Sequence, residues 1–89
     1  MAEIAKHIFF SGSVQGVGFR FTAERVAMRY NLTGFVRNTS EGRVEMLVQG
    51  RAEDIDYAIE DLQQTFAVRD AQIEEIPLDS SYEDFRITF

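Results

Sequence analysis

The sequence contains no cysteine and only one histidine among its 89 residues. The absence of cysteine excludes disulfide bonds, thiolate nucleophiles and cysteine-based zinc sites. The single histidine, His7, has no second imidazole with which to form a histidine-rich metal site and does not fit a familiar pair of nucleophile and base. We therefore expect no metal site built from cysteine or histidine, and we expect a structural or surface role for His7.

Long apolar runs and an excess of positive charge are also missing. No apolar run approaches the roughly 20 residues that span a bilayer, and residues 1–6 are too polar for a signal peptide. We therefore expect a cytoplasmic protein with no membrane partner. The formal net charge of −6 argues against a nucleic-acid partner, since binding the phosphate backbone needs a basic face. The same charge repels small anions, so any anion site must be local.

What is present is enough apolar material for one core. Hydrophobic residues make up 45% of the chain and include eight phenylalanines. The length, together with the absence of an internal repeat or linker, predicts a single domain over residues 1–89. We expect it to act as a monomer.

The order of apolar and polar residues predicts five strands and two helices. The strands are expected at residues 6–13, 32–38, 43–49, 71–76 and 85–89. The helices are expected from residue 19 or 20 to 30, and at residues 52–66, because both segments carry an apolar stripe at helical spacing. Gly50 is expected to end a hairpin formed by the second and third strands.

This order is β-α-β-β-α-β with an added C-terminal strand. It predicts the ferredoxin-like α+β sandwich, an antiparallel sheet with both helices on one face. The four acidic residues on the outer face of the second helix do not converge, and we interpret them as a solvated surface rather than a metal site. Fold alone does not fix function, because this architecture hosts many unrelated activities.

The most informative stretch is the glycine-rich loop at residues 12–20, Gly-Ser-Val-Gln-Gly-Val-Gly-Phe-Arg, between the first strand and the first helix. A loop in this position points backbone N–H groups into one concavity at a helix N-terminus, which favours an anion. Arg20 adds a planar guanidinium suited to two phosphate oxygens. The loop fits neither the dinucleotide fingerprint nor the P-loop. The alternative is an ordinary turn with glycines that serve packing and a surface arginine.

Asn38 is the second candidate, at the end of the second predicted strand. Its carboxamide can donate one hydrogen bond and accept another, so it could orient a water molecule. The alternative is that Asn38 caps a turn, a common role for asparagine.

Taken together, the loop at residues 12–20, the segment Gly-Phe-Val-Arg-Asn-Thr at 34–39 and the later Gly42, Val44 and Gln49-Gly50 closely resemble the acylphosphatase family. The similarity extends over nearly the whole chain. It implies a metal-free and cofactor-free hydrolase that cleaves the carboxyl-phosphate bond of small acyl phosphates. By the same resemblance, Arg20 and Asn38 are catalytic: Arg20 binds the phosphoryl group together with the backbone amides of the loop, and Asn38 holds the attacking water. The loop residues concerned are Gln15, Gly16, Val17, Gly18 and Phe19.

One position departs from the family pattern, and two other functions compete with hydrolysis. Position 13 is often basic in the family and is Ser13 here, from which we expect weaker substrate binding. The first competing function is a non-catalytic module that binds phosphate or acyl phosphate through the same loop. The second is an RNA-recognition module, which has the same strand order. It is disfavoured by the acidic charge and by the absence of aromatic residues at positions 43–49.

Overall fold

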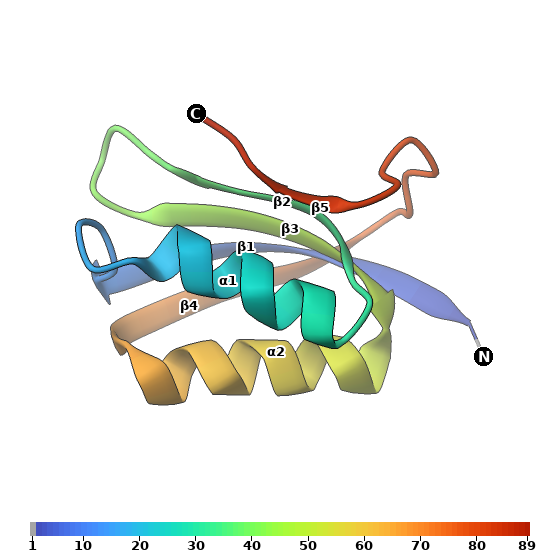
Figure 1. Ribbon diagram of the computed structural model, residues 1–89, viewed down its shortest axis with the longest axis horizontal. Coiled ribbons are helices and arrows are strands. Elements are labelled where there is room, and N and C mark those ends of the chain that lie inside the picture. The colour runs from blue at the N-terminus through green and yellow to red at the C-terminus, as the bar shows by residue number, and fades with distance from the viewer. Residues whose placement is uncertain (1) are drawn as a thin grey trace.

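The computed structural model describes residues 2–89 and contains a five-stranded sheet with two helices on one face (Figure 1). In chain order the elements are β1 (Glu3–Ser13), α1 (Phe19–Arg29), β2 (Thr33–Asn38), β3 (Val44–Arg51), α2 (Ala52–Thr65), β4 (Ala67–Ile76) and β5 (Phe85–Ile87). The strands lie in the order β4-β1-β3-β2-β5. The ferredoxin-like α+β fold is therefore confirmed, with the added strand at one edge of the sheet.

The core lies between the sheet and the two helices. Both helical stripes predicted from the sequence are buried at most positions: Ala23, Val26 and Ala27 in α1, and Ile55, Ala58, Ile59 and Leu62 in α2. Val44, Met46 and Val48 on β3 are fully buried, with mostly polar residues between them in the sequence. Phe19, the first residue of α1, joins this core, with its ring centroid 5.0 Å from that of Phe10 on β1. The start of α1 is therefore anchored directly to the sheet.

The prediction of a wholly antiparallel sheet was wrong for the last strand, because β5 pairs with β2 in parallel. The reason is the path of residues 77–84, which cross the end of the sheet from one edge strand to the other (Figure 1). Strands β1 and β2 run in the same direction, because each is antiparallel to β3. Strand β4 is antiparallel to β1, so β5, which runs back in the direction opposite to β4, is parallel to β2. Buried Gln49 fixes this path: it donates a hydrogen bond to the carbonyl oxygen of Asp79 (3.0 Å) and accepts one from the Asp79 amide (2.7 Å).

Several predicted ends also need correction. The fourth strand begins at Ala67 and not at residue 71, because a β-bulge at Ser11 and Gly12 lets its first residues continue the pairing with β1. The third strand does not stop at Gly50 but continues to Arg51, and Gly50 pairs with Ile4. The fifth strand is shorter than predicted and ends at residue 87. None of the helices among residues 2–89 combines the length and apolarity needed to cross a membrane.

Candidate functional site

The topology of the sheet brings the glycine-rich loop and Asn38 to one end of the molecule. Strands β1 and β2 both pair antiparallel with β3, which lies between them, so they run parallel to each other. The loop follows the end of β1, and Asn38 is the last residue of β2. Their positions at the same edge follow from strand direction alone, and Figure 1 shows the loop beside the turn that joins β2 to β3.

The backbone of the loop has the conformation that its glycines allow. Gly16 (φ 74°) and Gly18 (φ 83°) lie in the left-handed region, which other residues rarely adopt. Gly18 is the N-cap of α1 and provides no side chain to cap it, and the first turn of the helix contains no acidic residue. The first amides of α1 therefore keep their hydrogen-bonding capacity and their partial positive charge at the loop. This arrangement favours an anionic ligand.

The side chain of Gln15 holds the loop against the neighbouring turn. Its Nε2 donates two hydrogen bonds, each 2.8 Å long, to the carbonyl oxygens of Thr39 and Arg43. Thr39 directly follows Asn38, so the two parts of the site are joined by one side chain. Sequence reasoning considered only the backbone amide of Gln15, because the acceptors lie 24 and 28 residues away and only the folded register brings them close.

Arg20 and Asn38 line the same cavity, which has a volume of about 220 Å³. The residues that line it are Val14, Gly16, Gly18, Phe19, Arg20, Phe21, Asn38, Ile87 and Phe89. The structure thus brings together five of the seven residues predicted for the site. The other two, Gln15 and Val17, do not line the cavity: the first braces the turn, and the second is about half exposed.

The guanidinium of Arg20 is available to a ligand. Among residues 2–89, six of the nine Lys and Arg residues form salt bridges, and Arg20 is one of the three that form none. Its Cζ lies 5.3 Å from the centroid of the Phe89 ring, a cation–π contact that leaves the charge uncompensated. With Ser13 at the end of β1, Arg20 is also the only cationic residue in the stretch 12–20.

Asn38 has a carboxamide oxygen that its surroundings do not satisfy. The Oδ1 atom is buried and has no hydrogen-bond partner among residues 2–89. Leaving a buried acceptor unpaired costs about 1–3 kcal/mol, so such atoms are uncommon and call for an explanation. A turn-capping asparagine would use this oxygen to accept a backbone N–H. The observation therefore favours a carboxamide that is kept for a ligand or a water molecule.

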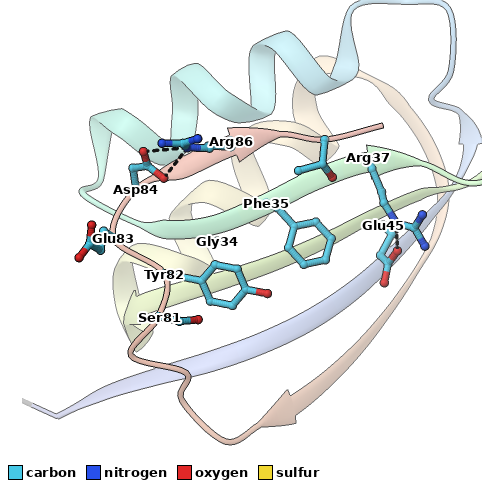
Figure 2. Close-up of a pocket in the computed structure, with 10 residues that line it drawn as sticks. Gly34, Phe35, Arg37, Glu45, Ser81, Tyr82, Glu83, Asp84 and Arg86 are labelled. Atoms are coloured by element: carbon cyan, nitrogen blue, oxygen red, sulfur yellow. Dashed lines mark hydrogen bonds and ion pairs between the residues drawn. The ribbon is translucent and has the colours of Figure 1, made fainter.

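A larger cavity, of about 640 Å³, lies on the opposite side of β2, against the segment that leads into β5 (Figure 2). Sequence reasoning did not anticipate it. Both of its arginines are already paired with carboxylates, Arg37 with Glu45 and Arg86 with Asp84, as the dashed lines in Figure 2 show. Because these charges are compensated, the larger cavity is a poorer anion site than the smaller one, where Arg20 has no carboxylate partner among the described residues.

The single histidine lines neither of these two cavities, but it contacts Glu45 in the wall of the larger one. His7 Nε2 lies 2.7 Å from Glu45 Oε2, and Arg37 donates to the other oxygen of the same carboxylate. Burial by itself would raise the pKa of Glu45, but the hydrogen bonds from His7 and Arg37 outweigh it and hold this pKa below its usual value. No group of three or more His, Asp or Glu residues in the described part of the chain could hold a metal ion.

Comparison with known proteins identifies the family. A sequence model of the acylphosphatase family matches residues 6–87. The chain belongs to the acylphosphatase family. An acylphosphatase from Alcanivorax borkumensis is 43% identical over 79 residues, which cover 89% of this chain and 84% of the relative.

Solved acylphosphatase structures agree with the fold. The crystal structure of acylphosphatase from Bacillus subtilis superposes with a TM-score of 0.90 at 30% identity, covering 97% of this chain and 99% of that one. The structure of an acylphosphatase from Coxiella burnetii gives a TM-score of 0.87 at 38% identity, covering 97% and 93%. The family resemblance inferred from the two sequence segments is thus confirmed. The match extends well beyond the loop and Asn38 to all the strands and helices of the acylphosphatase fold.

Proposed function

We propose that this chain hydrolyses small acyl phosphates to a carboxylate and inorganic phosphate. The observation that carries the proposal is one cavity lined by Arg20, which forms no salt bridge within residues 2–89, by the uncapped start of α1 and by Asn38, whose buried Oδ1 has no partner in the same part of the chain. Membership of the acylphosphatase family supports the same reaction.

Arg20 and the amides of the loop would bind the phosphoryl group. The guanidinium fork of Arg20 can donate to two phosphate oxygens at once. The N–H groups of Gln15, Gly16, Val17, Gly18 and Phe19 are the further donors that we propose, of which Gly16, Gly18 and Phe19 line the cavity. Donors fixed around the equatorial oxygens stabilise the charge of the transferring phosphoryl group without reorganising during the reaction.

Asn38 would hold the attacking water. Its unpaired Oδ1 can accept a hydrogen bond from the water and so turn a lone pair of the water oxygen toward phosphorus. The new bond joins that oxygen to phosphorus as the bond from phosphorus to the acyl oxygen breaks. The bonding electrons leave with the carboxylate, and the protons of the water stay on the inorganic phosphate.

The chemistry needs little else. The leaving carboxylate is the conjugate base of an acid with a pKa near 4, so no side chain has to protonate it. We therefore propose a reaction without metal or cofactor. On composition and on the assembly of the cavity from one chain, we also propose a cytoplasmic monomer in which residues 1–89 act as one domain.

The test is hydrolysis of acetyl phosphate by the purified chain in the presence of a chelator. Arg20→Ala should abolish phosphate binding and turnover. Arg86→Ala removes the same charge from an exposed residue that pairs with Asp84, and it should leave activity within about twofold of wild type. Binding of inorganic phosphate without any turnover would instead favour the non-catalytic module. Normal turnover in Arg20→Ala would refute the proposed site.

A further inference from the structure

We propose that the exposed rings of Phe21 and Phe89 form the binding site for the acyl group and select acyl phosphates with an aromatic acyl group. This inference rests on the proposed function and adds the substrate class. The sequence alone marked no pocket for the acyl group. The structure places these two rings in the cavity that Arg20 and Asn38 line.

The two rings lie where the acyl group of a bound substrate would reach. Phe21 follows Arg20 in the first turn of α1, and Phe89 lies beyond β5, beside Ile87 on the wall of the same cavity. The Cζ of Arg20 is 5.3 Å from the centroid of the Phe89 ring. Only one oxygen separates phosphorus from the acyl carbon, so the acyl group of a substrate held by Arg20 stays in the cavity whose wall includes this ring.

Neither ring contributes to the core of the protein. Phe21 is 58% exposed and Phe89 is 96% exposed, whereas Phe19, which lines the same cavity, is buried against Phe10 and Phe66. Single exposed apolar residues are common on protein surfaces and need no explanation. Two exposed rings that converge on one cavity, next to an available guanidinium, gain buried apolar contact when an apolar ligand enters.

The two phenylalanine rings favour one class of acyl group. An aromatic acyl group can stack on or meet the edge of each ring, and such a pair adds roughly three- to tenfold in affinity beyond the area that it buries. A methyl group gains little from either ring. An aroyl phosphate such as benzoyl phosphate should therefore be favoured over acetyl phosphate.

The experiment measures kcat/KM for benzoyl phosphate and acetyl phosphate in the wild type, Phe21→Ala and Phe89→Ala. Dividing the variant-to-wild-type ratio for one substrate by that for the other cancels the intrinsic reactivity of the two anhydrides. Each variant should lose roughly three- to tenfold more with benzoyl phosphate than with acetyl phosphate, mainly through KM. The inhibition constant of inorganic phosphate should stay unchanged in Phe21→Ala, because the loop and the contact between Arg20 and Phe89 are intact. In Phe89→Ala, any phosphate binding lost through Arg20 affects both substrates and cancels in the ratio.

Two further variants keep the test decisive. Met28→Ala removes another exposed apolar side chain from α1 that does not line the cavity, and it should affect both substrates equally. Phe21→Leu keeps apolar bulk without the ring, and it should give an intermediate loss if Phe21→Ala does not fold. Equal losses for the two substrates in every phenylalanine variant would overturn the inference while acetyl phosphate turnover still supports the proposed function. If the wild type hydrolyses neither substrate, the proposed function fails first.

Discussion

Replacing Asn38 by alanine should separate activity from stability. The proposed role of this residue is to hold the attacking water, so its loss removes an interaction made at the reacting centre. Removing one such positioning group typically costs about 10²- to 10³-fold in kcat. Binding of inorganic phosphate should change far less, because Arg20 and the loop amides remain.

The expected effect of Asn38→Ala on stability follows from the contacts of its side chain. Deleting a hydrogen-bonded group usually costs about 0.5–1.5 kcal/mol, but Oδ1 of Asn38 accepts no hydrogen bond from residues 2–89. Its removal instead relieves an unpaired buried acceptor, which offsets the packing lost when a half-buried side chain is truncated. We therefore expect the free energy of unfolding to change by less than about 1 kcal/mol, or roughly 4–8 °C in Tm at most.

The neighbouring residue provides a control with the opposite pattern. The hydroxyl of Thr39 accepts a hydrogen bond from the backbone N–H of Arg43 (3.1 Å), and so stabilises the turn after β2. Thr39→Ala should lower the free energy of unfolding by about 1 kcal/mol and reduce kcat much less than Asn38→Ala does. Thermal unfolding followed by circular dichroism and steady-state kinetics measure both quantities. A clear loss of stability in Asn38→Ala with unchanged kcat would show that the residue caps a turn and does not position water.

Three other changes test the framework of the site. Gln15→Ala removes two hydrogen bonds of 2.8 Å between the loop and the turn after β2. It should lower the free energy of unfolding by about 1–3 kcal/mol and raise KM more than it lowers kcat. An unchanged KM would contradict the proposal that Gln15 holds the loop in place. Glu45 has a lowered pKa, so its ionised form stabilises the fold above its usual value near 4.5, and this contribution is lost as the pH falls through the lowered pKa. The difference in unfolding free energy between wild type and Glu45→Gln should thus shrink below pH 4.5, and urea titrations showing no pH dependence would refute this. Gly34→Ala would place Cβ 1.9 Å from the carbonyl oxygen of Leu47, at a φ of 132°, and should lower the free energy of unfolding by about 3 kcal/mol or more. Gly42→Ala has free space around its Cβ and should cost only about 1–2 kcal/mol for the positive φ. Equal effects of the two variants in chemical denaturation would contradict the clash at Gly34.

The parts of the fold that the sequence predicted well depend on local periodicity. The alternation of apolar residues in β3 and the apolar stripes of α1 and α2 identify the faces that pack in the core. Side chains return to the same face every 2 residues in a strand and every 3.6 residues in a helix, so the pattern of burial can be read from the sequence. The position of Asn38 beside the loop is also predictable in principle, once the order β-α-β-β-α-β places β1 and β2 in the same direction. The loop and the end of β2 therefore carry most of the proposed site in two short segments.

The parts that the sequence did not predict depend on contacts between distant segments. The parallel pairing of β5 follows from the anchoring of Asp79 by Gln49, 30 residues earlier, and no local pattern reports it. The same holds for Gln15 and its two acceptors. The sequence does not indicate that the exposed ring of Phe89 contacts Arg20, because Phe89 there is only the last apolar residue of a predicted strand.

The charge distribution explains why so few groups should suffice. At a net charge of −6, the protein as a whole repels a phosphate dianion at long range, so its field does not favour capture. Screening limits this repulsion to roughly 8–10 Å at physiological ionic strength, while short hydrogen bonds inside a cavity are screened much less. Under the proposed function, affinity must therefore come from donors in direct contact with the phosphate. An arginine paired with a carboxylate could not supply it, which is why the absence of a salt bridge at Arg20 within residues 2–89 matters more than the total number of cations.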